Sequence, residues 1–193
     1  MSERFDAAVA AIDAANAADP VRITVDGAEQ AKELAHADLV ERWVRVLDPE
    51  ASELQLLAAR AHHLRRWVVP RSDYPEGRAG YLRWRTDHKK RQAAEVGEIL
   101  AASGYDADEI ERVGTIVAKR HLATDAAVQT HEDALCLAFL QLQFDELAEQ
   151  LGDDHMIEVV RKTIAKMSPA GLAAAGSIAM SEHGAEILQA AAS

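Results

Sequence analysis

The chain has 193 residues, a single cysteine and a formal net charge of −11. This length suits one domain. Because one cysteine cannot form an internal disulfide, we expect a reducing, cytoplasmic compartment. Apolar residues make up 49% of the chain, which excludes intrinsic disorder. No segment approaches the roughly 18 uninterrupted apolar residues of a membrane span, and the acidic beginning does not have the pattern of a secretory signal. The net acidity argues against a protein that coats nucleic acid, although it leaves binding to an RNA end open.

Residue preferences indicate an all-α protein. Alanine, the most favourable helix former, dominates the apolar residues, and the ITV run at 23–25 is the one short strand candidate. Asp48-Pro49-Glu50 has the order of a helix start, Thr130 is placed to cap a later helix, and Ser168-Pro169 is placed to cap the last one. We expect about seven to nine helices, at about 3–18, 28–47, 49–68, 78–102, 106–120, 131–150, 154–167 and 169–190, with a proline-containing loop at 68–77.

Nothing in the sequence divides the chain into separate domains. It has no internal repeat and no long linker, so we expect a single domain over 1–193. Its core should lie at about 28–150, with a C-terminal helical extension at 151–193. The last predicted helix is rich in alanine, and small side chains let helices approach closely. One interpretation of the chain is therefore an oligomeric scaffold joined through 169–193.

Charge is strongly segregated in one segment. Residues 60–91 carry ten arginines and lysines against three acidic residues, together with two tryptophans and two tyrosines. Arginine forks match phosphate or carboxylate oxygens and aromatic faces stack on rings, so the segment predicts a site for a small anionic or phosphorylated molecule, including a nucleotide. The alternative is a solvated basic surface that pairs with acidic neighbours. The candidate ligand-binding residues are Arg60, Arg66, Trp67, Arg71, Tyr74, Arg78, Tyr81, Trp84 and Arg85.

Histidines in two predicted helices are candidate metal ligands. His63 lies beside the apolar stripe of the 49–68 helix, and His62 projects about 100° away from it. His36 lies on the apolar line of the 28–47 helix, with Glu33 one turn before it as a supporting carboxylate. The alternative for each histidine is a hydrogen-bonded residue at the boundary of the core. A di-iron bundle is disfavoured because the chain has no second Glu-x-x-His.

The segment HEDALCLAF contributes a candidate carboxylate. Asp133 shares the face of Leu137 and Leu140, and a carboxylate at the head of an apolar stripe needs a partner. One interpretation makes Asp133 a metal ligand. The other pairs it with Thr130 in a capping box at the start of the helix. Cys136 has apolar neighbours and is predicted to be an inert core thiol.

The order of these residues resembles the HD superfamily of metal-dependent phosphohydrolases. That family has a histidine on one helix, a His-Asp pair at the end of the next, and a distant aspartate near the start of a later helix. Here His36 matches the first, His62-His63 stands where His-Asp is expected, and Asp133 matches the last. The resemblance implies an HD-like helical bundle with a divalent metal ion. The histidine at position 63 alters the dyad, so either a substituted ligand set or a non-catalytic site is compatible with it.

A closer resemblance covers nearly the whole chain. The segments RFDAAVAAIDAANAADP, LAARAHHLRRW, VPRSDYPEGRAGYLRWRT, THEDALCLAFL and RKTIAKMSP are similar to a bacterial and fungal family, domain of unknown function 4202. In that pattern His63 and Asp133 match better than His36 or His62. The resemblance implies the fold and the neighbourhood of the site without implying a reaction.

We expect the chain to be a metal-dependent phosphohydrolase that acts on a small phosphorylated, nucleotide-like substrate. His63 and Asp133 would hold the divalent ion, with His62 or His36 as a third ligand, and the ion would activate water. Lys119 would help to neutralise the phosphate, and Glu132 would position the water. The alternative is a non-catalytic module whose basic-aromatic segment binds an anionic ligand, a phosphorylated protein or an RNA end.

Overall fold

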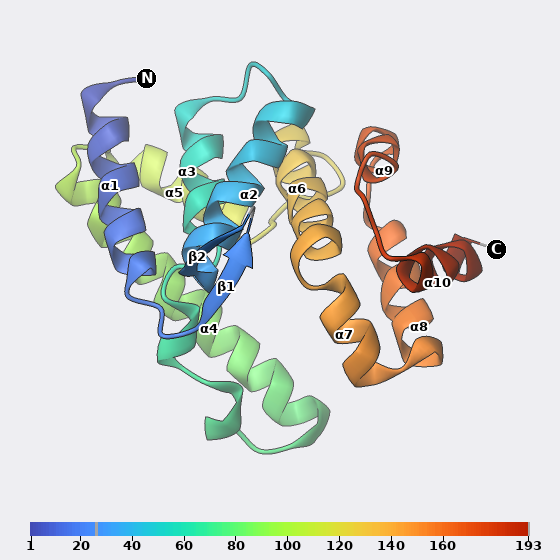
Figure 1. Ribbon diagram of the computed structural model, residues 1–193. Helices are drawn as coiled ribbons and strands as arrows, with labels where there is room; N and C mark the ends of the chain where they lie inside the picture. The colour runs from blue at the N-terminus through green and yellow to red at the C-terminus, as the bar shows by residue number, and fades with distance from the viewer. Residues whose placement is uncertain (26, 193) are drawn as a thin grey trace.

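The structure, a computed structural model, describes residues 1–25 and 27–192 (Figure 1). Over these residues the chain is mostly helical, which confirms the all-α class, and the exception is a short antiparallel pair of strands, β1 (Arg22–Val25) and β2 (Ala28–Ala31). The α-helices of the described residues are α1 (Glu3–Ala17), α2 (Lys32–Leu47), α3 (Glu53–Ala61), α4 (Gly77–Ala102), α5 (Ala107–Val117), α6 (Ala126–Leu142), α7 (Phe144–Leu151), α8 (Asp153–Ile164), α9 (Pro169–Ala175) and α10 (Glu182–Ala192).

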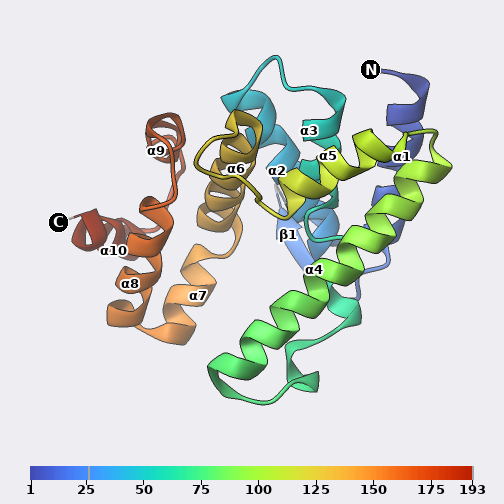
Figure 2. The ribbon, with the colours of Figure 1, turned by 180° about the vertical axis from the view of Figure 1, so that it is seen from behind.

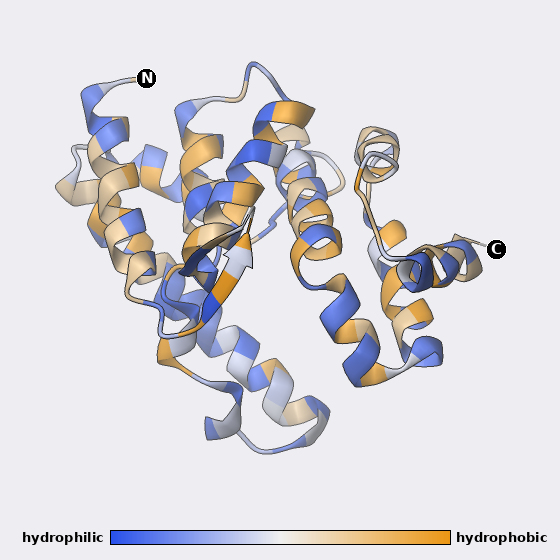
Figure 3. Cartoon of the chain, in the orientation of Figure 1, coloured by the Kyte–Doolittle hydropathy of each residue, from blue (hydrophilic) through white to orange (hydrophobic). Residues whose placement is uncertain are grey.

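Helix α2 lies at the centre of the larger group of helices. It packs against α3 and α6, while α1 and α5 pack on α3. Helix α4 runs diagonally across the back of this group (Figure 2). The core between the helices includes Val40, Leu57, Leu100 and Ile116, all fully buried. Apolar and polar residues alternate in bands along these helices (Figure 3), as expected where one face of each is buried.

The C-terminal helices form a second, smaller apolar cluster. Phe144 of α7, Met156 of α8 and Ile187 of α10 are its largest buried side chains. Helix α9 packs on α6, and its Ala175 packs against the second cluster, so α9 contacts both groups. These helices lie on the side of α6 that faces away from α1, and the two chain ends are far apart (Figure 1). The second cluster includes α7 and so begins before residue 151.

Helix α2 begins later than the sequence predicts. Residues 28–31, expected to be helical, pair with the strand at 22–25, in the register Arg22 to Ala31 and Val25 to Ala28. The carboxylate of Asp19 accepts hydrogen bonds from the backbone N–H groups of Val21 and Glu33. This buried side chain therefore connects the strands to the first turn of α2.

Helix α3 is shorter than predicted at both ends. It begins at Glu53 rather than at residue 49, because Ser52 and Gln55 form a reciprocal capping box. It ends at Ala61 rather than at 68, and the chain then turns through Arg65, whose φ of 48° lies in the left-handed region. This early end places His62 and His63 on a turn at the end of a helix.

Helix α6 begins one turn before the predicted start. Asp125 caps it by accepting hydrogen bonds from the N–H groups of Ala127 and Val128, so the predicted cap at Thr130 is wrong and Thr130 lies inside the helix. The predicted helix at 131–150 is divided between α6 and α7, and that at 169–190 between α9 and α10. The cap predicted at Ser168 is confirmed, because its hydroxyl accepts from Gly171 N–H.

The length and polarity of the helices also bear on membranes. In residues 1–25 and 27–192, none of the helices combines the length with the apolar character needed to cross a bilayer.

Candidate functional site

Four histidines from three elements meet at one place in the larger helical group. His36 comes from α2, His62 and His63 from the turn after α3, and His131 from α6. The ring centroids of His36 and His63 are 4.2 Å apart, those of His62 and His63 are 4.7 Å apart, and those of His62 and His131 are 5.0 Å apart. The packing of α2 against α3 and α6 is what brings these rings together.

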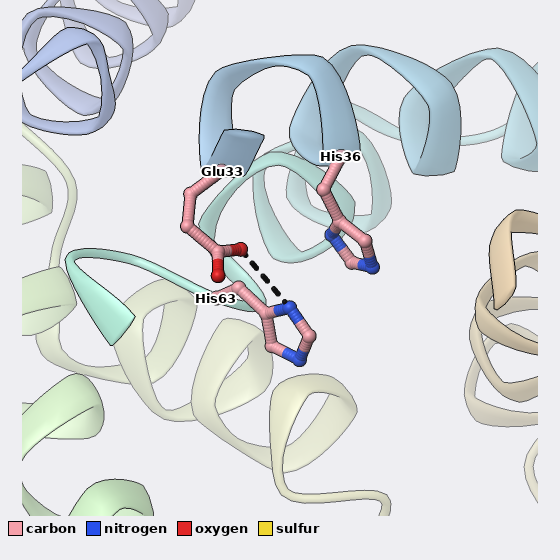
Figure 4. Close-up of side chains that lie close together, drawn as sticks. All are labelled: Glu33, His36 and His63. Atoms are coloured by element: carbon pink, nitrogen blue, oxygen red, sulfur yellow. Dashed lines mark hydrogen bonds and ion pairs between the residues drawn. The ribbon is translucent and has the colours of Figure 1, made fainter. Parts of the chain in front are cut away.

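Three of the side chains here have the donor atoms and spacing of a metal site. Glu33, His36 and His63 each offer one ligand atom, and these atoms lie within 4.8 Å of one another (Figure 4). Glu33 and His36 are three residues apart on α2, so they lie on the same face of the helix. Glu33 and His36 are buried and His63 is partly buried. Carboxylate and imidazole are the usual ligands of zinc and similar divalent ions.

The hydrogen bonds of His63 determine its tautomer. The Arg66 guanidinium can only donate, and its Nη1 lies 2.8 Å from His63 Nε2, so that nitrogen accepts. The proton is therefore on Nδ1, which donates to Glu33 Oε2 over 3.2 Å. A chain of contacts thus runs from a cation through an imidazole to a buried carboxylate.

Burial keeps the cluster poor in charge. Desolvation lowers the pKa of His36, His62 and His63 well below the ordinary histidine value, and the neighbouring cationic groups add to this effect. Desolvation lowers the pKa of His131 to about 3. Neutral imidazole is the form that binds metal, so these lowered pKa values are compatible with a metal site at neutral pH. Burial also raises the pKa of Glu33, an effect that a bound cation would offset.

A basic cavity opens beside the histidines. Its volume is about 310 Å³, and its walls include His62 and His63. Trp84 closes one side, where its indole N–H donates to the carbonyl of Val69 and Arg66 lies 5.0 Å from its ring centroid. Among the described residues that line it, none carries a carboxylate. The cations of the wall are Arg66, Arg85, Lys89, Lys119 and Lys166.

A buried carboxylate positions two of these cations. Glu132 of α6, 3% exposed, pairs with Lys119 Nζ at 2.6 Å and with Lys166 Nζ at 3.8 Å. Lys119 has a φ of 56°, a left-handed conformation that is costly for a residue with a side chain. The ion pair with Glu132 therefore coincides with a strained backbone at the wall of the cavity.

Comparison with known proteins gives a family and no activity. The chain matches the family described as Domain of unknown function (DUF4202) over residues 6–188. The chain belongs to this family. The matched range includes all four histidines of the site and the buried residues of both apolar clusters except Phe5 and Ala191. Neither a curated protein nor a solved structure gives a significant match to the chain.

Several residues predicted for the site do meet there. The structure brings His36, His62 and His63 together, and it brings Arg66 and Lys119 to the adjoining cavity. Tyr81, Trp84 and Arg85 line the same cavity. Glu132 lies behind its wall with its carboxylate directed to the two lysines.

Asp133 is placed elsewhere. Its carboxylate accepts hydrogen bonds from the backbone N–H and the hydroxyl of Ser168 at 2.9 and 2.5 Å, and from Gln129 Nε2 at 3.0 Å. Asp133 and His131 are two residues apart on α6, so they project about 200° apart around the helix. Asp133 therefore faces α9, and the structure does not bring it to the histidines.

The other predicted ligand-binding residues support the fold or lie outside the basic cavity. Arg60 is held by Asp13, Asp38 and Glu41 at 2.6 to 2.8 Å. The guanidinium of Arg71 donates to three carbonyls of the 74–77 loop, and Tyr74 donates to Asp87. Arg78 is exposed and is not among the residues lining the basic cavity, and Trp67 lines a different cavity.

Sequence reasoning did not single out His131, Lys89 or Lys166 as residues of the site. His131 was overlooked because Asp133, two residues later, was favoured as the ligand. Lys166 lies in the RKTIAKMSP segment, far along the chain from 60–91, and only the packing of α9 on α6 brings that part of the chain near. Lys89 was counted in the basic segment without being singled out.

Proposed function

We propose that the protein is a divalent-metal-dependent phosphohydrolase that acts on a small phosphorylated compound. The observation that carries this proposal is the position of His63. It belongs to the group of three potential metal ligands and also lines the cavity whose charged wall residues are all cationic. A metal-activated water and the phosphorus that it attacks must be close neighbours, and His63 joins the two places.

The donor set fits a divalent ion. Two ligand atoms that share one ion at about 2.1 Å with tetrahedral angles lie about 3.4 Å apart. Glu33 Oε2 and His63 Nδ1 are 3.2 Å apart, close to that value. An ion there would displace the Nδ1 proton to Nε2, and Arg66 would turn away from that nitrogen. His36 Nδ1 is buried and has no hydrogen-bond partner among the described residues. An ion bound by Glu33, His36 and His63 would lower the pKa of a water molecule and polarise the phosphoryl oxygens.

The chain's own residues would bind and orient the phosphate. Arg66, Arg85 and Lys119 come from separate elements around one cavity, so they can contact several phosphoryl oxygens at once. Glu132 keeps Lys119 and Lys166 in place through its two ion pairs. Both carboxylate oxygens face lysines, so the proposal gives Glu132 a positioning role rather than contact with water.

The HD-like interpretation belongs to this proposal. The order of His36 on α2 followed by His62 and His63 after α3 is the order of the first HD ligands. On α6 the residue that contacts this group is His131, whose Nε2 lies 3.2 Å from His62 Nδ1. An imidazole would thus take the place that the superfamily gives to its distant aspartate.

The experiment compares metal content and turnover in two histidine variants. We expect protein purified without chelator, then supplied with Mn²⁺, Co²⁺ or Ni²⁺, to bind about one equivalent and to release phosphate from a phosphomonoester panel. His63→Ala should lose both properties. His155→Ala removes an exposed histidine of α8 and should retain both. Equal metal content in His63→Ala and the parent, or no bound metal in either, contradicts the proposal.

The basic cavity also supports a second candidate, a non-catalytic anion-binding module. Its five cations and lack of lining carboxylates need no metal to attract phosphate. In this case inorganic phosphate should bind equally well with and without chelator, and His63→Ala should leave its affinity unchanged. Arg85→Gln lowers phosphate affinity under either function, so the chelator and His63 arms separate the two.

A further inference from the structure

A second cavity adjoins the basic cavity at Arg66. Its volume is about 320 Å³, and it shares His63, Arg66 and Trp84 with the basic cavity. Glu33 also lines it, so two of the three potential metal ligands lie on its wall. The two cavities thus adjoin the same histidine and the same arginine. A ligand whose reacting group lies at His63 has space on both sides.

The two cavities differ in charge. The basic cavity has five cations and no carboxylate on its wall. The second cavity has two carboxylates, Asp19 and Glu33, and two cations, Lys32 and Arg66, so its formal charges cancel. Apart from the attraction of an ion bound at His63, a phosphate is therefore drawn to the first cavity and gains little from the side chains of the second. The neutral part of a phosphorylated compound is better suited to the second cavity.

The wall of the second cavity carries a flat surface and free polar groups. Trp67 is half-buried there, beside Val69 and Pro70. Within 1–25 and 27–192, neither the Trp67 indole N–H nor the side-chain amide of Gln143 has a hydrogen-bond partner. An indole face stacks on aromatic rings, and an unpaired N–H and amide can bond to heteroatoms at a ring edge.

We propose that this second cavity, the Trp67 cavity, binds an uncharged ring-containing group of the substrate while the basic cavity binds its phosphate. The inference rests on the proposed function, because it takes the phosphate to lie beside His63. It makes the substrate a phosphate ester of a ring-bearing alcohol, with the ring and the phosphate on opposite sides of Arg66. Trp67, predicted from the sequence as a ligand-binding residue, then has a role that differs from that of the arginines.

The experiment uses two probes that differ only by a ring. Ethylphosphonate and 2-phenylethylphosphonate contain a carbon–phosphorus bond, so the protein cannot hydrolyse them during titration calorimetry. Stacking of one ring on one aromatic side chain typically changes affinity by about tenfold. We expect 2-phenylethylphosphonate to bind about tenfold more tightly than ethylphosphonate. Trp67→Leu should remove this difference, and Trp67→Phe should retain most of it.

Trp43→Leu is the matched control. Trp43 belongs to α2, donates to Gln141 and lines neither cavity. This variant should keep the preference for the ring. If the two phosphonates bind equally to the parent, or if Trp67→Leu weakens both to the same extent, the Trp67 cavity is not a ring site while the phosphate site remains. If neither phosphonate binds and Arg85→Gln changes nothing, the basic cavity is not a phosphate site and the proposed function fails with it.

Discussion

Asp133→Ala should destabilise the protein without removing the proposed metal site. The buried carboxylate accepts three hydrogen bonds, two from Ser168 and one from Gln129. Hydrogen bonds to charged groups contribute about 1.5–3 kcal/mol each, and the groups left unpaired can partly reach water, so we expect a loss of about 3–5 kcal/mol. For a chain of this size, that loss lowers the unfolding temperature by roughly 8–15 °C.

The space around Asp133 supports the same role. A Cβ added at Gly171 would lie 2.6 Å from Asp133 Cγ, so α9 can approach the carboxylate only because residue 171 is glycine. Asp133→Asn keeps an acceptor for the two N–H donors, and its amide can donate to the Ser168 hydroxyl, so it should cost only about 1 kcal/mol. Urea unfolding measures these losses, and elemental analysis measures bound metal. Loss of metal from Asp133→Ala with an unchanged unfolding midpoint would refute the structural assignment and restore Asp133 as a ligand.

Two further predictions concern the fold around the site. Gly80→Ala should lower the unfolding temperature markedly, because its Cβ would lie 1.8 Å from the carbonyl oxygen of Pro75. Gly97→Ala in the same helix brings its Cβ only to 3.5 Å from Ile110 and should raise the free energy of unfolding by about 0.5–1 kcal/mol. Equal melting curves for the two variants would contradict this prediction. Arg60→Leu should lower the free energy of unfolding by about 3 kcal/mol or more, because three carboxylates lose a mostly buried partner. Its phosphate affinity, measured by calorimetry, should equal that of the parent. A selective loss of phosphate binding would instead place Arg60 in the ligand site.

The start of a helix could be predicted where the sequence contains a single capping pattern. Ser168-Pro169 predicts the start of α9 correctly, because no competing cap lies nearby. At α3 two patterns compete, Asp48-Pro49-Glu50 and Ser52-x-x-Gln55. The second prevails because Ser52 and Gln55 satisfy two backbone N–H groups reciprocally. The sequence contains this capping box, so the true start of α3 was within reach of sequence reasoning.

The potential metal ligands on α2 could be predicted from the sequence, whereas their approach to His63 could not. The three-residue spacing of Glu33 and His36 places them on one face of any helix. That His63 reaches this face depends on α3 ending at Ala61, and the left-handed turn at Arg65 is stabilised by a hydrogen bond from its N–H to Asn16 of α1. A contact over 49 residues of sequence leaves no mark in local residue patterns.

The three consecutive residues of α6 show why adjacency in sequence misled the assignment of the site. Successive side chains on a helix point about 100° apart, so His131, Glu132 and Asp133 cannot all serve one ion. His131 contacts His62, Glu132 pairs with Lys119 and Lys166, and Asp133 binds Ser168. The same turn of α6 therefore contacts the histidine cluster, positions cations of the adjoining cavity and attaches α9. Because Lys166 lies two residues before Ser168, the hydrogen bonds that Ser168 donates to Asp133 also help to hold that lysine near the cavity.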